Sequence, residues 1–64
     1  MKIKDFKKTK LFKIANIVEY MDQDGNEIGN ITNTLWKKLQ SKEITNIKTR
    51  IEKELFIVTL YINI

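Results

Sequence analysis

The C-terminal segment 55–64 constrains the fold most, because it is apolar on both of the faces that a β-strand presents. One face would carry the alternating side chains Phe56, Val58, Leu60, Ile62 and Ile64. The other face would carry Leu55, Ile57 and Tyr61. A strand of this kind is central in its sheet or has its second face covered by another chain. The segment therefore predicts a strand that dominates the core in one of these two arrangements.

The length of the chain limits how such a sheet can be stabilised. A domain of 64 residues buries only about 60% of the surface that its unfolded chain exposes. The sequence has no Cys and no His, which excludes disulfides and the common zinc sites, and we expect no cofactor. A subunit interface is the remaining source of stability. Unless the basic N-terminal segment covers Leu55, Ile57 and Tyr61, a two-fold partner must cover them, and on this ground the sequence predicts a homodimer.

The segment before the only two glycines, Gly25 and Gly29, has two possible periodicities. Residues 12–20 alternate with period two, as in a strand, while Leu11, Ile14 and Ala15 also follow a helical spacing. The stretch Asp24-Gly25-Asn26 supplies residues that suit a hairpin turn, and this favours the strand. We therefore expect a hairpin of residues 11–21 and 27–31.

The next segment predicts a short helix and then a third strand. Thr32 or Asn33 can cap a helix over residues 33–42, with an apolar stripe that includes Leu35, Trp36 and Leu39. Residues 47–52 alternate between apolar and polar side chains, as in a half-exposed strand. The expected fold class is α+β, in the order ββαββ. One short helix would lie on one face of a small antiparallel sheet.

Positive charge is concentrated at the N-terminus. Residues 1–13 hold six lysines against Asp5 alone, a sum of +5, whereas the other 51 residues sum to −1. Nothing divides residues 1–64 into more than one domain. We expect residues 1–10 to form a basic N-terminal arm on that domain, available to a negatively charged partner.

Catalysis is not expected from this set of residues. Ser41 is the only serine, and its neighbour Lys42 would point elsewhere on a helix. The acidic turn matches only the first three ligand positions of a calcium loop, Asp22, Asp24 and Asn26, and its glycine is misplaced. A structural hairpin turn explains these residues better, so we expect neither an enzyme nor a metal protein.

Nucleic-acid binding is the leading hypothesis for function. Lysine contacts phosphate as a point charge, whereas reading of guanine commonly uses Arg, and Arg50 is the only arginine. Phe6 and Trp36 could stack on bases, but apolar anchoring explains both more simply. The candidate nucleic-acid-binding residues are Lys4, Lys7, Lys8, Lys10, Lys13, Lys37, Lys38 and Lys42.

The alternative is a protein-interaction module, such as a phage- or plasmid-type inhibitor or regulator of a host protein, which would use the apolar sheet face. Residues with AT-rich codons (Phe, Tyr, Met, Ile, Asn and Lys) make up 35 of the 64 positions, which favours a low-GC bacterium or its mobile elements. No apolar run approaches the ~20 residues that span a bilayer. We expect a cytoplasmic protein that does not bind membranes.

Overall fold

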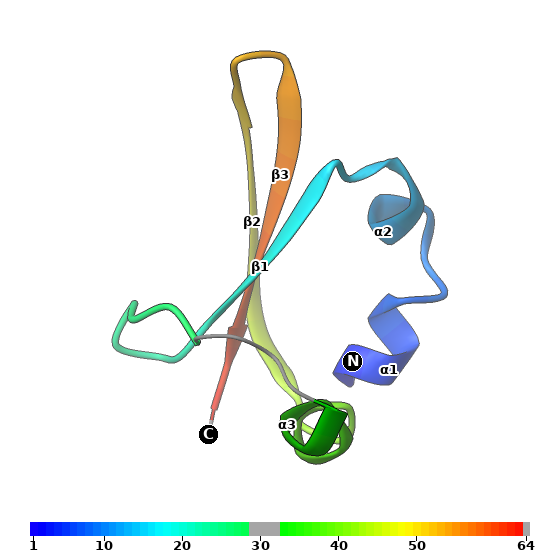
Figure 1. Ribbon diagram of the computed structural model, residues 1–64, viewed down its shortest axis with the longest axis vertical. Helices are drawn as coiled ribbons and strands as arrows, with labels where there is room; N and C mark the ends of the chain where they lie inside the picture. Colours follow the sequence, from blue (N-terminus) through cyan, green and yellow to red (C-terminus); the bar gives the residue numbers. More distant parts are fainter. Residues whose placement is uncertain (29–32, 64) are drawn as a thin grey trace.

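The computed structural model describes residues 1–28 and 33–63, and these form one mixed sheet with short helices. The elements are α1 (Ile3–Phe6), α2 (Lys10–Ile14), β1 (Ile17–Met21), α3 (Asn33–Leu39), β2 (Ile44–Glu52) and β3 (Leu55–Ile62). The strand order is β1-β3-β2, with β1 parallel and β2 antiparallel to β3 (Figure 1). The α+β class is confirmed. The predicted order ββαββ and the all-antiparallel sheet are wrong.

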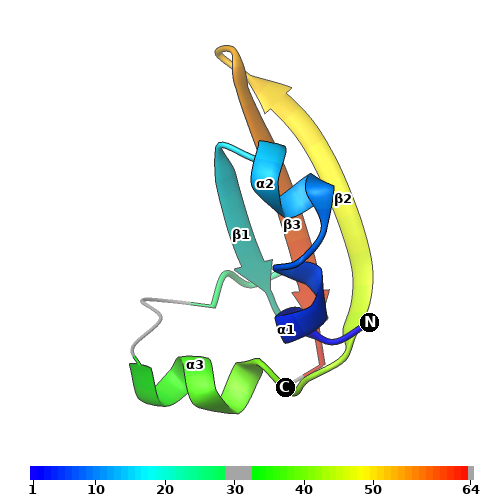
Figure 2. The ribbon, with the colours of Figure 1, turned by 90° about the vertical axis from the view of Figure 1, so that its right-hand side faces the viewer.

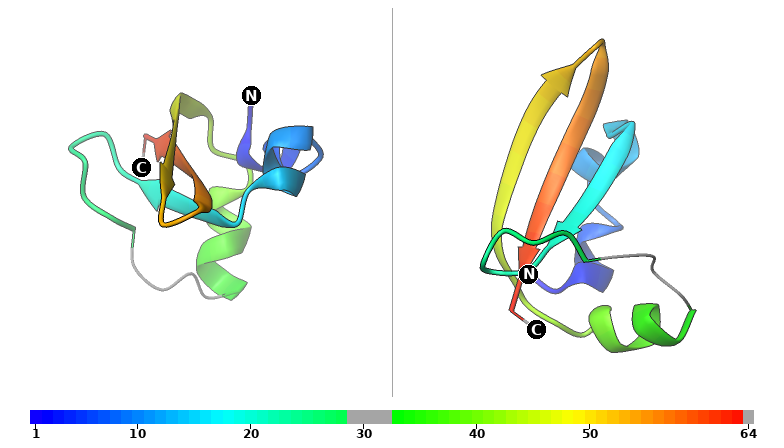
Figure 3. Two further views of the ribbon diagram at one scale, coloured as in Figure 1. Left: turned by 90° about the horizontal axis from the view of Figure 1, so that it is seen from above. Right: turned by 60° about the vertical axis from the view of Figure 1, so that its left-hand side comes forward.

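Strand β3 is the central strand, which is one of the two arrangements that its sequence predicts (Figure 3). Its side chains Val58, Leu60 and Ile62 are fully buried on the face that the helices cover. Ile64, which the sequence places on the same face, lies outside the described residues. The doubly apolar pattern therefore identified the strand, and the structure decides between the two arrangements that the pattern allows.

Residues 10–14 are helical, which corrects the strand predicted for 11–21. Thr9 caps α2, because its Oγ1 accepts a hydrogen bond from the Phe12 N–H at 3.3 Å. The same hydroxyl donates to the carbonyl of Phe6 at 2.6 Å, which links α1 to α2. The strand begins only at Ile17. The helical spacing of the sequence thus applies to residues 10–14, and the extended strand follows it.

The acidic turn forms where the sequence places it, but the hairpin that it closes is very short. Asp22 Oδ1 accepts hydrogen bonds from the backbone N–H groups of Asp24 and Asn26, each at 2.9 Å. Gly25 has a φ of 85°. A bridge joins Met21 to Glu27, and the rest of the predicted strand 27–31 lies mostly outside the described residues. The Asp22 carboxylate thus has a structural role in the turn.

The N-terminal ten residues are part of the folded domain, which corrects the prediction of a basic arm on its surface. Ile3 and Phe6 are fully buried, and Figure 2 shows α1 and α2 against one face of the sheet. The backbone N–H groups of Ile3 and Lys4 donate to the carbonyls of Lys42 and Gln40 at 3.2 and 3.1 Å. Because the apolar residues of this segment lie in the core, the segment cannot detach without disrupting it.

Helix α3 occupies most of the predicted range 33–42 and closes one end of the core. Leu39 is buried with Ile3 and Ile62, and Leu35 and Trp36 pack against this cluster. The predicted apolar stripe is therefore confirmed for these three helix residues. Thr32, the other capping candidate, lies outside the described residues.

The turn between β2 and β3 has two non-glycine residues in the left-handed backbone conformation, and this gives a testable prediction. Lys53 and Glu54 both have positive φ, 50° and 69°, between the paired residues Glu52 and Leu55. A two-residue turn of this kind strongly prefers Gly at its second position. Glu54→Gly is expected to increase the free energy of unfolding by about 0.5–1 kcal/mol, which corresponds to roughly 4 °C in Tm.

Thermal unfolding followed by circular dichroism would measure this change. Glu54→Ala is the matched control, because it removes the same carboxylate and keeps a Cβ in the left-handed conformation. An equal gain from both substitutions would mean that loss of charge, rather than relief of the backbone, stabilises the turn.

Candidate nucleic-acid interface

The fold gathers most of the lysines on the helical side of the molecule. Residues 1–14 and 33–43 hold nine lysines and two carboxylates, a net charge of +7. The rest of the chain holds three bases and six carboxylates, a net charge of −3. The nine lysines are Lys2, Lys4, Lys7, Lys8, Lys10, Lys13, Lys37, Lys38 and Lys42, which we call the lysine surface. The folded protein is thus more strongly polarised than its sequence suggests.

Contacts between α1 and α3 join the two lysine sets that are separate in the sequence. The Lys4 N–H bonds to the carbonyl of Gln40, near the end of α3. Lys7 Nζ lies 3.7 Å from the centroid of the Trp36 ring, which is a close cation–π contact. The ring of Phe12 is 5.9 Å from the same ammonium. Trp36 thereby holds one lysine from the N-terminal set beside the lysines of α3.

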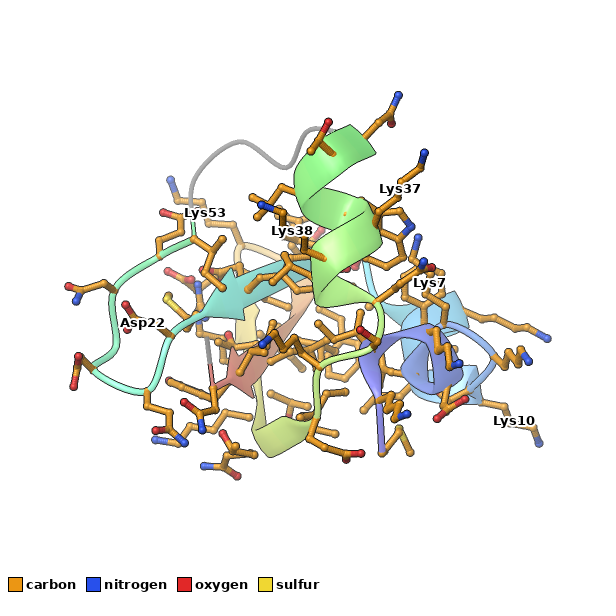
Figure 4. All side chains as sticks on the ribbon, turned by 90° about the horizontal axis from the view of Figure 1, so that it is seen from below. Lys7, Lys10, Asp22, Lys37, Lys38 and Lys53 are labelled. Atoms are coloured by element: carbon orange, nitrogen blue, oxygen red, sulfur yellow. The ribbon has the colours of Figure 1, made fainter. Side chains whose placement is uncertain are left out.

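The side chains of the lysine surface do not form an even array. In Figure 4, Lys7, Lys10 and Lys37 extend toward one side of the molecule, whereas Lys38 leaves α3 on its other side. Lys53 and Asp22 lie away from the first three. Lys37 therefore extends to the same side as Lys7 and Lys10, and Lys38 does not. Lys2 belongs to the same region by its position, although the sequence did not single it out.

The candidate lysines are available to a partner. The ion pairs within residues 1–28 and 33–63 are Met1 with Glu43, and Arg50 with Glu19 and Glu52. None of the eight candidate lysines takes part in these pairs, and all eight are exposed. Exposed ammonium groups without carboxylate partners in the described chain can approach an anion with little competition.

The aromatic residues of this region serve the core. Phe6 is buried and meets Phe12 edge to face, with ring centroids 6.0 Å apart and an interplanar angle of 82°. It therefore anchors the N-terminal segment and cannot stack on a base. Trp36 is half-buried against the core, and its ring makes the cation–π contact with the Lys7 ammonium. The simpler role expected for both side chains, apolar anchoring, is the one that the structure shows.

Polar side chains of the chain itself cross the open face of the sheet, which lies opposite the helices. From β2, the Arg50 guanidinium reaches across β3 to bond Thr59 Oγ1 at 3.2 Å and Glu19 Oε1 on β1. It also donates to Glu52 Oε2 at 2.7 Å. These hydrogen bonds, to Glu52 first and then Glu19, raise the pKa of Arg50. A continuous polar network thus crosses the sheet.

This network bears on the predicted dimer interface, because it covers part of the face on which that interface was expected. Ile57 is only 5% exposed, because Ile17 and Arg50 are its direct neighbours on either side. Tyr61 is half-buried, with Lys48 Nζ 5.4 Å from its ring centroid, and Leu55 alone of the three predicted interface residues is exposed. The face therefore does not need a second chain to cover it, which removes the reason for placing an interface there.

Within residues 1–28 and 33–63, no three acidic side chains are grouped so that they could hold a metal ion. No helix in these two ranges is long and apolar enough to cross a membrane. Neither a family model, nor a curated protein, nor a solved structure significantly matches the chain.

Proposed function

We propose that this protein is a non-catalytic, sequence-tolerant nucleic-acid-binding accessory or regulatory protein that contacts phosphates through the lysine surface. The observation that carries the proposal is that Lys37 of α3 extends to the same side as Lys7 and Lys10, in a region with a net charge of +7 against −3 elsewhere (Figure 4). A polarised surface of this kind attracts a polyanion and orients it before contact.

The chemistry of the side chains supports backbone contact over base reading. Every base of the lysine surface is a lysine, and the single arginine, Arg50, is held by two carboxylates on the opposite face. Lysine binds phosphate without the bidentate geometry that distinguishes guanine. The described aromatic rings of this region lie in or against the core, so base stacking contributes little. The proposal therefore predicts affinity with weak sequence preference.

Salt dependence tests the proposal directly. If about five phosphates are neutralised, the logarithm of the association constant should fall with the logarithm of salt concentration at a slope near −4.5 for duplex DNA. Fluorescence anisotropy with labelled duplexes and single strands of unrelated sequence would measure this slope. Absence of binding to every DNA and RNA probe at low salt, or binding that does not change with salt, would reject the proposal.

The protein-interaction hypothesis predicts a complex that tolerates salt. Its expected contact surface, the apolar sheet face, is crossed by the network of Arg50, Glu19 and Glu52. That face keeps Ile17 and Leu55 exposed, at 40% and 41%, but its centre is polar, and the lysine surface is the better-supported site.

A further inference from the structure

The outer edge of β2 is the most exposed apolar feature of the sheet. β2 lies at one end of the strand order, and eight of its nine residues are exposed. Ile51 is 74% exposed and Ile47 is 36% exposed, although both lie on the face that the helices cover over β1 and β3. An edge strand with uncovered apolar side chains is a surface on which another strand can pair.

The direction of the backbone groups in β3 can be read from its contacts with the residue before β1. The Phe56 N–H donates to Asn16 Oδ1 at 2.7 Å, and the Phe56 carbonyl accepts from the Asn16 N–H at 2.9 Å. Both backbone groups of Phe56 thus point toward β1. Because these directions alternate along a strand, those of Leu55 and Ile57 point toward β2.

The directions of the backbone groups in β3 determine which backbone groups of β2 face outward. Arg50 is opposite Ile57, so its backbone groups point inward to β3, and those of the alternate residues Ile47, Thr49 and Ile51 point to the free edge. Ile47 agrees with this assignment, since its N–H bonds to the side chain of Asn46 at 2.9 Å. The residues with outward backbone groups thus include the two exposed isoleucines.

The free part of this edge has defined ends. At its start, the Ile44 N–H donates to the carbonyl of Met1 at 2.8 Å, and Lys2 forms a bridge with Glu43. At its other end, the strand turns at Lys53. The pairing of β2 with β3 is irregular between Ile44 and Asn46, so the regular free stretch begins at residue 46. This stretch, residues 46–52, has Thr49 at its midpoint.

We propose that a second copy of this chain pairs with this edge, β2 against β2, about a two-fold axis through Thr49. This register uses the whole free stretch, with residue 46 opposite residue 52 of the other copy. Ile47 lies opposite Ile51 of the second copy, and Thr49 lies opposite its own equivalent. All three pairs 47–51, 49–49 and 51–47 are hydrogen-bonded pairs, giving six backbone bonds. Pairing replaces the Asn46 amide as the partner of the Ile47 N–H.

The charges on the open face are compatible with this register. Lys48 lies opposite Arg50 of the second copy, which alone would be unfavourable. However, Arg50 is paired with both Glu19 and Glu52, so this group carries a net charge of −1. Each Lys48 therefore meets a net negative group at the dimer axis, twice by symmetry.

The proposed dimer has one consequence for the shape of the protein. A two-fold axis perpendicular to the sheet gives a six-stranded sheet with the helices of both copies on the same side. The two lysine surfaces then face the same way. The pairing itself does not depend on nucleic-acid binding and is tested without nucleic acid.

Light scattering of the native chain and of two variants at residue 49 tests the proposal. Thr49→Pro removes the central outward N–H but no bond to β3, whereas Thr49→Val keeps that N–H. We expect the native chain and Thr49→Val to dimerise with equal affinity and Thr49→Pro to dimerise at least about tenfold more weakly, with unchanged circular dichroism. A native chain that stays monomeric up to about 1 mM, or a dimer that Thr49→Pro leaves intact, would overturn the proposal.

A cysteine scan tests the register and does not depend on how Thr49→Pro folds. The chain has no Cys, so each variant has a single thiol. Two-fold pairing at Thr49 places the two Cα atoms about 5.5 Å apart, within disulfide range, whereas the two Cα atoms of Ile51 are roughly 14 Å apart. Thr49→Cys should cross-link under mild oxidation and Ile51→Cys should not. Equal cross-linking of both variants, or none at Thr49→Cys, would refute this register.

Discussion

Replacing Phe6 with Ala is expected to lower the free energy of unfolding by about 3–5 kcal/mol. The side chain is fully buried among Val58, Leu60 and the ring of Phe12, so its removal leaves a cavity as well as losing apolar burial. A domain of this size has only about 5 kcal/mol of total stability to lose. The variant should therefore be largely unfolded at 25 °C.

Urea denaturation followed by the fluorescence of Trp36, the only tryptophan, measures this effect. Ile14→Ala is the matched control, because Ile14 is an apolar residue of the same N-terminal segment and is 63% exposed. We expect less than about 1 kcal/mol from the control. Equal, small effects of both substitutions would mean that residues 1–14 are a detachable segment and would contradict the fold described above.

Neutralising two lysines of the lysine surface is expected to weaken nucleic-acid binding strongly. The double variant Lys10→Gln with Lys37→Gln removes one ammonium from each of the two lysine sets. If each contacts a phosphate, the salt slope should become less steep by about 1.8, with roughly tenfold or greater loss of affinity at low salt. The loss should be the same for all probe sequences.

The control double variant is Lys48→Gln with Lys53→Gln, which changes the net charge equally at positions outside the lysine surface. Its salt slope should stay that of the native chain, and its affinity should fall only slightly, through the smaller long-range field. Equal losses in the two double variants would show that net charge alone, and not a defined surface, determines binding.

The sequence predicted the elements whose pattern has one physical interpretation. Segment 55–64 is apolar on both faces, which predicts a strand that is central or covered by another chain, and β3 is central. Helix α3 and the turn at Asp22 likewise follow from an apolar stripe and from turn residues. In each case the local preference and the tertiary environment agree.

The sequence was ambiguous where two interpretations compete locally. Residues 11–15 fit helical and strand spacings equally, and the Thr9 cap, which joins α2 to α1, decides for the helix. The burial of Ile3 and Phe6 was not predicted, because a basic segment with two apolar residues has no strong periodicity. Their spacing of three residues is a single helical turn, and this was the available signal.

The local sequence pattern could not predict how segments far apart in the chain pair and pack. The parallel pairing of β1 with β3 depends on the connection through α3, and nothing in residues 17–21 specifies its direction. The reach of Arg50 across β3 to Glu19 joins residues 31 positions apart in the sequence. The placement of Lys37 on the same side as Lys7 and Lys10 depends in turn on the packing of α1 against α3. The lysines themselves were predicted, but their common surface required the fold.

The most direct test of the lysine surface is to map which backbone amides respond to nucleic acid. In ¹H–¹⁵N NMR spectra recorded during titration with a short DNA duplex, the largest shift changes should fall in residues 1–14 and 33–43. The amides of β1 and those near Arg50 on the open face should change little. Changes centred on the open face, or spectra unchanged by a saturating duplex at low salt, would contradict the account.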